Sequence, residues 1–235
     1  YRFTKKANSK AREMFEKAIE LDPKYAAAYT FIGFSYWMEF AFGWSKEVQS
    51  LDRAFNYAQS AISMNDLEPK AHLLLGKVYL WKKQHDQAIA EAEKTIALNP
   101  NNADGLASLG EILVFAGRSV EAIGLIKKAI RLNPIPPVWY FHSLGHAYFL
   151  TGRYEQAVDT LKRVLNRTPN FYPAHIYLAA SYVEMGQEDK ARAELEKILK
   201  IIPKFSLKNR KGRLPYKDPT IFERLSALLG KAGLK

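Results

Sequence analysis

The sequence contains one pair of histidines with the spacing of a metal site. His142 and His146 stand four residues apart, so a helix would place both imidazoles on one face. A zinc site needs a third ligand, which Glu111 could supply, and a zinc protease needs glutamate directly after the first histidine. Ser143 follows His142 instead, which excludes the protease motif. Because two histidines alone are an incomplete site, we expect no bound metal and place both residues on a surface or in a groove.

Other signatures of catalysis are missing from the sequence as well. It has no Gly-x-Ser-x-Gly turn, phosphate-binding loop or dinucleotide fingerprint, and its carboxylates are scattered over polar stretches. It has no cysteine, which excludes thiolate chemistry and fits a reducing compartment. Its apolar runs are too interrupted to span a membrane. We therefore expect a cytoplasmic protein that is not an enzyme and binds no cofactor. Since the chain begins with Tyr1, we also expect it to be a piece of a longer protein.

A fixed repeat runs through the 235 residues. Alanines that open a common apolar pattern recur at intervals of 43, 34, 34, 35 and 34 residues, as Ala11, Ala54, Ala88, Ala122, Ala157 and Ala191. A small residue in the preceding apolar stretch keeps the same interval, as Gly33, Gly76, Gly110, Gly145 and Ala179. A period of this length predicts a stack of similar supersecondary units.

Each unit is predicted to form two amphipathic helices. In residues 103–116 the apolar positions recur at helical spacing; Gly117 is placed to end that helix, and Pro134 ends the next. Gly110 falls in the middle of the first helix, where glycine costs about 1 kcal/mol relative to alanine. Glycine is tolerated there when a neighbouring helix must approach closely. We therefore interpret Gly110 and its equivalents as helix contacts and not as a phosphate loop.

Two successive units carry the clearest pattern. Its members are Leu109, Gly110, Leu113, Ala122, Ala129 and Pro134 in one unit, and Leu144, Gly145, Tyr148, Gly152, Tyr154, Ala157 and Pro169 in the next. With the 34-residue period, this pattern resembles the tetratricopeptide repeat (TPR) family over roughly residues 8–203. The resemblance implies an all-α, right-handed superhelical solenoid of antiparallel helix pairs, with a concave groove lined mainly by the first helix of each pair.

The period divides a single TPR domain, residues 1–235, into about 5.5 repeats. Their ranges are 1–25 (partial), 26–68 (with an insertion), 69–102, 103–137, 138–171 and 172–205. Residues 206–235 are predicted to form a basic connector and a capping helix. Asp218 and Pro219 are placed to begin that helix, which we expect to cover the exposed face of the last repeat.

The insertion in the second repeat is rich in aromatic residues. It adds nine residues between Tyr36 and Ala54, and its rings are Trp37, Phe40, Phe42 and Trp44. We predict an extended first helix that Gly43 ends, with Ser45 capping the following helix. The rings either pack within the longer helix pair or form a lip that grips a partner.

Positions that line the groove in the TPR family correspond here to aromatic and charged residues. The predicted partner-binding residues are Phe34, Trp37, Lys70, Lys77, Trp81, Glu111, Phe115, Trp139, His142, His146 and Phe149. The resemblance thus implies a scaffold that binds a peptide or a partner domain in its groove. The alternative is that some of these rings pack between helices. The identity of the partner and self-association stay open.

A closer resemblance gives an alternative function. The GWS of the elongated repeat, the TGRYEQAV unit and the closing LPYKDP…ERL…KAGL are similar to the TPR region that follows bacterial class III adenylate or guanylate cyclase domains. Related regions follow winged-helix regulator domains. This resemblance implies a regulatory segment that transmits partner binding to a catalytic or DNA-binding domain.

The net charge of +11 is concentrated at the two ends of the chain. Residues 1–12 carry five basic side chains and residues 197–217 carry eight, without an acidic one, whereas residues 13–196 hold 19 basic and 22 acidic side chains. Nucleic-acid binding needs clustered basic residues, and single strands also need rings for base stacking. Only Phe205 and Tyr216 lie near the second basic run, so we expect a solvated connector and no nucleic-acid partner.

Overall fold

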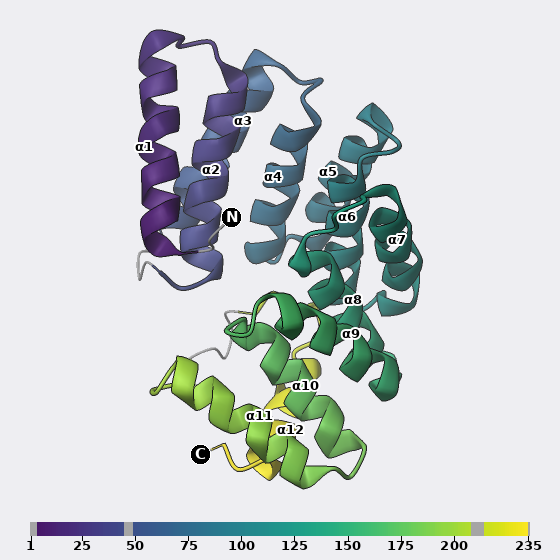
Figure 1. The fold of residues 1–235 in the computed structure, drawn as a ribbon. Coiled ribbons are helices and arrows are strands. Elements are labelled where there is room, and N and C mark those ends of the chain that lie inside the picture. Colours follow the sequence, from purple (N-terminus) through teal and green to yellow (C-terminus); the bar gives the residue numbers. More distant parts are fainter. Residues whose placement is uncertain (1–3, 45–48, 208–213, 235) are drawn as a thin grey trace. The chain divides into compact units, whose positions relative to one another are not determined.

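The computed structural model describes residues 4–44, 49–207 and 214–234, and within them it contains twelve helices and no strand. The helices are α1 (Lys5–Leu21), α2 (Ala26–Ala41), α3 (Gln49–Met64), α4 (Pro69–Trp81), α5 (His85–Leu98), α6 (Ala103–Phe115), α7 (Ser119–Leu132), α8 (Val138–Leu150), α9 (Tyr154–Arg167), α10 (Tyr172–Glu184), α11 (Glu188–Ile201) and α12 (Thr220–Lys231). The all-α repeat array predicted from the period is confirmed (Figure 1).

Contacts between helices divide the chain into two compact units, Tyr1–Ser108 (unit 1) and Leu109–Lys235 (unit 2). In unit 1, α1 packs on α2, α2 packs on α3 and α4, and α4 packs on α3 and α5. In unit 2, α8 packs on α7 and α9, and α10 packs on α8, α9, α11 and α12. A helix in such an array touches mainly its neighbours in sequence, so the chain has no single central core. That is why the one predicted domain corresponds to two units.

Left-handed residues end the first helices of the pairs. Gly117, Gly152 and Gly186 have φ angles of +84°, +73° and +69°, a region that glycine enters without steric cost. The predicted stop at Gly43 is confirmed, since its φ is +67° and α2 ends two residues before it. The predicted extension is confirmed too, because α2 has 16 residues where α4 has 13. Ser45 lies outside the described residues.

The repeated glycines and alanines bring the two helices of a pair together. The aligned alanines that are completely buried are Ala54, Ala88, Ala122, Ala157 and Ala191. A Cβ on Gly76 would lie 3.2 Å from the carbonyl oxygen of Ala88, and one on Gly110 would lie 3.3 Å from that of Ala122. Both distances are shorter than normal van der Waals contacts. The interpretation of these glycines as helix contacts is therefore confirmed.

We expect Gly145→Ala to destabilise unit 2 by about 1–2 kcal/mol, because overpacking outweighs the gain in helix propensity. The added Cβ would lie 2.7 Å from Cγ and 2.8 Å from Cδ2 of Leu161. Leu161 is completely buried and has no room to turn away. Gly124→Ala is the matched control, since Gly124 lies on the exposed side of α7 with nothing within 4 Å of an added Cβ. We expect that change to stabilise the protein by up to about 1 kcal/mol. Thermal unfolding measures both, and an equal gain from the two substitutions would contradict the close-contact interpretation.

Candidate binding faces

The predicted site residues of unit 1 lie together on α2 and α4, and we call Phe34, Trp37, Lys70, Lys77 and Trp81 the unit 1 face. The rings of Phe34 and Trp37 meet edge to face, with centroids 6.4 Å apart. These two rings and Trp81 are partly buried and pack against the apolar core of the unit. The rings are therefore anchored between helices and still partly exposed, and their use as a partner-binding surface stays a prediction.

Positive charge lies beside these rings. Lys77 Nζ is 5.0 Å from the centre of the Trp37 ring. Lys70 Nζ is 5.3 Å from the centre of the Phe31 ring. A lysine ammonium over an aromatic face is held by the ring quadrupole, and a cation at that place also attracts an anionic ligand. The unit 1 face thus combines partly exposed aromatic residues with an exposed cation, Lys70, and a buried one, Lys77, which is 5% exposed.

The end of the inserted region adds two further rings. Phe42 and Trp44 stack with centroids 5.1 Å apart, and both are partly exposed. Phe40, one residue before the end of α2, meets Trp81 edge to face at 5.7 Å. Phe40 therefore places one ring of the insertion against the unit 1 face.

In unit 2 the chain's own C-terminal segment, residues 214–232, covers part of the predicted groove. Phe115, His146 and Phe149 are 8%, 2% and 1% exposed. The Tyr216 ring lies 5.0 Å from Phe115, and the Arg224 guanidinium lies 5.3 Å from the centre of Phe149. This corrects the expectation of an open groove at these three positions. The period places them on the same side of the first helices, but it carries no information about an aperiodic segment that returns to them.

The other predicted residues of unit 2 surround this covered area. Trp139 lies at the start of α8, is partly exposed and meets Tyr140 edge to face at 4.5 Å. His142 is partly buried and contacts the rings of Phe171 and Tyr177, at 5.2 and 5.6 Å. Glu111 is close enough to His142 to favour its protonated form electrostatically. We call Phe115, His142, His146, Phe149 and Tyr177 the unit 2 face.

A polar network lies at the centre of the unit 2 face. The Tyr216 hydroxyl is 2.7 Å from His146 Nε2 and 2.8 Å from the Tyr177 hydroxyl. The His146 ring also stacks on Tyr177 at 4.1 Å. No periodicity signals this cluster, because Tyr216 lies 70 residues from His146 and outside the repeats. Sequence reasoning noted Tyr216 only as a ring near the basic run.

Burial keeps the network uncharged. It lowers the pKa of His146 well below its ordinary value, and the neighbouring His142 lowers it further. It likewise lowers the pKa of His142 to about 4, although Glu111 and a backbone hydrogen bond with Pro173 act in the opposite direction. Burial raises the pKa of Tyr216 well above its ordinary value. At neutral pH the phenol and the imidazoles therefore pair without a buried charge.

His146 is hydrogen-bonded within this network, and His142 contacts the neighbouring rings. His146 Nε2 is hydrogen-bonded to Tyr216, so it does not join Glu111 and His142 as a third metal ligand. Among the described residues, no three His, Asp or Glu side chains lie close enough to hold a metal ion. The same part of the chain has no helix that is both long and apolar enough to cross a membrane.

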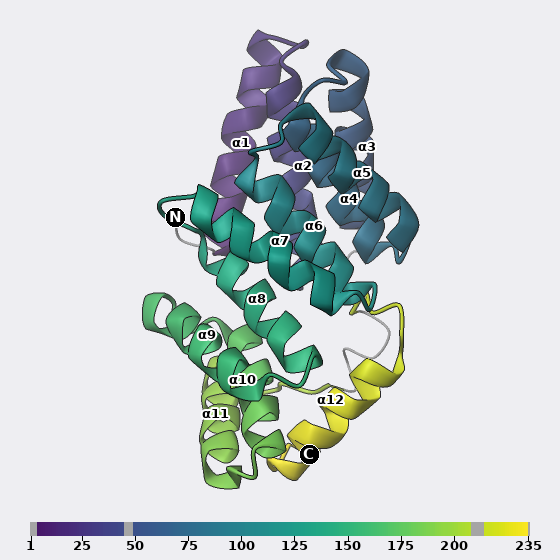
Figure 2. The same cartoon turned by 90° about the vertical axis from the view of Figure 1, so that its right-hand side faces the viewer.

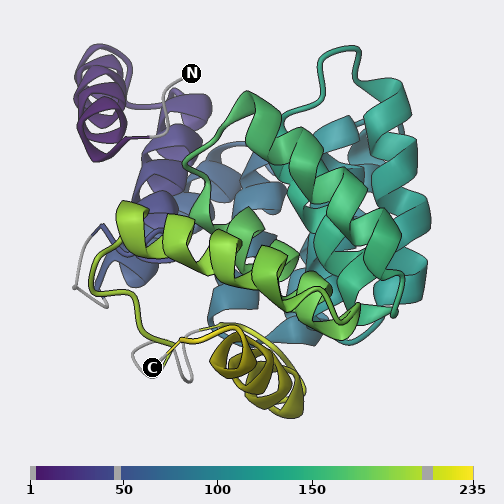
Figure 3. The ribbon, with the colours of Figure 1, turned by 60° about the horizontal axis from the view of Figure 1, so that its bottom comes forward.

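The last helix packs on the last repeat. We expected α12 to cover the exposed face of that repeat, residues 172–205, and it packs against α10, the first helix of the repeat (Figures 2 and 3). Arg224 on this helix reaches the Tyr154 hydroxyl at 2.8 Å, at the start of α9. The start of the helix is close to the prediction, since Asp218 Oδ1 accepts the Thr220 N–H at 2.9 Å and α12 begins at Thr220.

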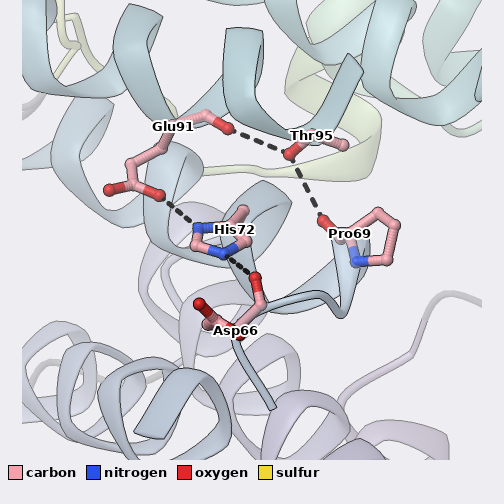
Figure 4. A network of polar contacts seen from close by, with 5 residues as sticks. All are labelled: Asp66, Pro69, His72, Glu91 and Thr95. Carbon is pink, nitrogen blue, oxygen red and sulfur yellow. Dashed lines mark hydrogen bonds and ion pairs between the residues drawn. The ribbon is translucent and has the colours of Figure 1, made fainter. Parts of the chain in front are cut away.

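Two further histidines, His72 and His175, are buried and make matching hydrogen bonds three repeats apart. His72 Nδ1 is 2.6 Å from Glu91 Oε2, and its Nε2 is 2.9 Å from the Asp66 carbonyl (Figure 4). Thr95 joins this network by donating to the Glu91 carbonyl at 3.0 Å (Figure 4). His175 pairs in the same way with Glu194 at 2.5 Å and with the Pro169 carbonyl at 2.9 Å. Sequence reasoning missed the two glutamates, although each follows its histidine by 19 residues. The contacts tie a first helix to its second helix and to the preceding turn, so their role is structural.

Models of the tetratricopeptide repeat match residues 3–25, 47–102, 82–134 and 148–208. The chain belongs to the TPR family. No curated protein sequence matches it.

Solved structures show the same fold. A chain of the APC/C hetero-tetramer Cut9–Hcn1 aligns with a TM-score of 0.75 and 22% identity, over 97% of this chain and 40% of that one. PilW, a type IV pilus biogenesis factor, aligns with a TM-score of 0.64 and 21% identity, over 86% of this chain and 87% of its own. YrrB, a TPR protein with an unusual peptide-binding site, aligns with a TM-score of 0.51 and 23% identity, over 82% and 94%. At these identities the likeness extends to the fold.

Proposed function

We propose that this chain is a protein-interaction scaffold and that its unit 1 face holds a segment of a partner protein. The observation that carries the proposal is the clustering of Phe34, Trp37 and Trp81 beside Lys70 and Lys77 on two adjacent first helices. Partly exposed aromatic residues that are held in place by packing are the usual anchors of interfaces. The peptide-binding site of YrrB supports this use of the fold. A chain without cysteine also suits the reducing cytoplasm, which we propose as its location.

The charges on the unit 1 face suggest the chemistry of the partner. Lys70 is exposed and Lys77 lies over the Trp37 ring. The nearby Glu39 is already paired with Arg12 at 2.6 Å, so its charge is compensated within the unit. We propose that the partner segment carries an apolar anchor for the rings and an acidic side chain for the exposed Lys70.

A peptide-display selection on the intact chain tests the function and the face together. For peptides selected in this way, we expect Trp81→Ala to weaken binding on the order of 30-fold, the effect typical of an interface anchor. Lys70→Ala should weaken binding less and reduce its dependence on salt. Leu67→Ala is the matched control, because Leu67 is 67% exposed in the turn before α4 and outside the face. Circular dichroism checks that helicity is kept. Selected peptides that bind all three variants like the parent chain would refute the unit 1 face as the site.

We propose the regulatory role in a nucleotide cyclase or transcriptional regulator as the alternative. What supports it is the covered unit 2 face, because a partner that displaced the C-terminal segment would change the structure of the chain itself. A transmitting segment needs such a difference between its free and bound states. The sequence encoded before Tyr1 in the genome tests this role. A cyclase or winged-helix domain there supports it, and a different domain would contradict it.

A further inference from the structure

Tyr216 occupies the unit 2 face in the way that a ligand side chain would. It is 5% exposed, and its hydroxyl makes the two hydrogen bonds to His146 and Tyr177 described above. Its ring lies against Phe115 and His146, with centroids 5.0 and 5.6 Å away. Three first helices, α6, α8 and α10, therefore each contribute one residue to the seat of a single ring.

The backbone beside Tyr216 is bound as well. The Lys217 N–H donates to the carbonyl oxygen of Phe115 at 2.9 Å. Phe115 is the last residue of α6, and the last carbonyls of a helix have no partner within it. Residues 214–218 are not helical. A main-chain hydrogen bond of this kind can hold an extended segment of any sequence, as in other modes of peptide recognition.

The helical half of the segment adds an ion pair and an apolar stripe. Arg224 Nε donates to Glu184 Oε1 at 3.1 Å, and the guanidinium lies over Phe149. Leu225 and Leu229 are 1% and 0% exposed on a helix that packs against α10. The segment thus contacts unit 2 through the phenol of Tyr216, the N–H group of Lys217, the guanidinium of Arg224 and the leucine side chains of α12.

We propose that the unit 2 face is a binding site for a partner segment that presents a tyrosine in an extended stretch followed by a basic amphipathic helix, and that residues 214–231 occupy this site as an internal competitor. This proposal rests on the proposed function in one respect: both place the bound partner on the first helices of the helix pairs. A helix that merely sealed the end of the array would need only apolar contacts. The hydroxyl pairs and the arginine ion pair select a particular side chain, which is what a recognition site does.

A fluorescent synthetic peptide of residues 214–231 tests the proposal with the full chain. The internal segment is present at an effective concentration on the order of millimolar, so it should block the peptide in the parent chain. In the variant Tyr216→Ala/Arg224→Ala the internal segment loses two anchors, and we expect the peptide to bind at least about tenfold more tightly than to the parent. A control peptide with alanine in place of its tyrosine should lose about tenfold in affinity on that variant. Tyr177→Phe, which removes one hydroxyl from the seat, should also weaken the peptide.

Equal affinity of the peptide for the parent and the double variant, or indifference to its tyrosine, would overturn the proposal. If the double variant loses helicity, Tyr216→Phe takes its place, because it keeps the ring and removes only the hydroxyl; unchanged peptide binding would then refute the site. Light scattering shows whether the parent chain is a dimer. If it is, and if the peptide dissociates the dimer, the partner is a second copy of this chain, which overturns the proposal of a different partner. Trp81→Ala leaves peptide binding unchanged if the unit 2 face is the site, so failure here is distinct from failure of the unit 1 face.

Discussion

Glu194→Ala is expected to lower the free energy of unfolding of unit 2 by about 3 kcal/mol, because it removes one partner of a buried ion pair. The Glu194 side chain is 9% exposed. Burial alone would raise its pKa, but hydrogen bonds from His175 and from Lys197 lower it, so the carboxylate is charged. His175 Nδ1 lies 2.5 Å from the Glu194 carboxylate, and its Nε2 lies 2.9 Å from the Pro169 carbonyl. Without Glu194 the buried Nδ1 atom loses its hydrogen-bond partner. Denaturant unfolding measures the loss.

Two variants separate the charge from the hydrogen bond. In Glu194→Gln a neutral His175 can donate from Nε2 to the Pro169 carbonyl and accept on Nδ1 from the new amide, so we expect a loss below about 1.5 kcal/mol. Glu91→Ala removes the matching carboxylate of unit 1, whose side chain is 23% exposed. Water can reach the His72 site more easily, and the expected loss there is about 1–2 kcal/mol. Equal losses from the two alanine substitutions would show that burial does not set the size of the effect.

The helix pairs could be predicted from the sequence because a repeat makes the same contact at a constant spacing. Gly110 contacts Ala122 in the same way as Gly76 contacts Ala88, so the sequence contains the same pair of small residues several times at one spacing. The turn glycines could also be predicted from the sequence, because a left-handed φ favours glycine at positions such as Gly117 and Gly152. These residue patterns recur in successive repeats, and their recurrence distinguishes them from chance similarities.

The covered part of the unit 2 face could not be predicted, because nothing in the sequence repeats it. Tyr216 and Arg224 lie outside the period, and each meets its partners once, up to 70 residues away. The positions taken from the TPR family placed His146 in the predicted groove, but its bond to Tyr216 depends on where an aperiodic segment returns. The apolar stripe of α12 indicated a helix packed on the last repeat, without indicating that Arg224 reaches Tyr154 of the repeat before it.

Acidification from pH 7 to pH 5 is expected to lower the free energy of unfolding of unit 2 by about 2 kcal/mol through His146 alone. In the folded chain, burial and His142 depress its pKa, so the imidazole stays neutral. In the unfolded chain a histidine titrates near pH 6.5. Below that pH the unfolded state binds more protons than the folded state, so stability falls as the pH falls. Above pH 6.5 both states are neutral and the contribution is constant. His142 adds to the loss in the same direction, and Glu111 reduces its share by favouring the protonated form.

The variant His146→Gln isolates this effect, because glutamine does not titrate and its amide oxygen can accept the Tyr216 hydroxyl. We expect a smaller difference in unfolding free energy between pH 7 and pH 5 for this variant than for the parent, by about 2 kcal/mol. Glu194 does not interfere in this window. Its lowered pKa gives stability that is present above the titration of an unfolded glutamate, near pH 4.3, and is lost only below it. Identical pH profiles for the parent and His146→Gln would show that His146 takes up a proton as readily in the folded chain as in the unfolded chain, and the uncharged network would then be wrong. A shallower profile for the variant means that the folded unit 2 face holds the His146 imidazole in its neutral form.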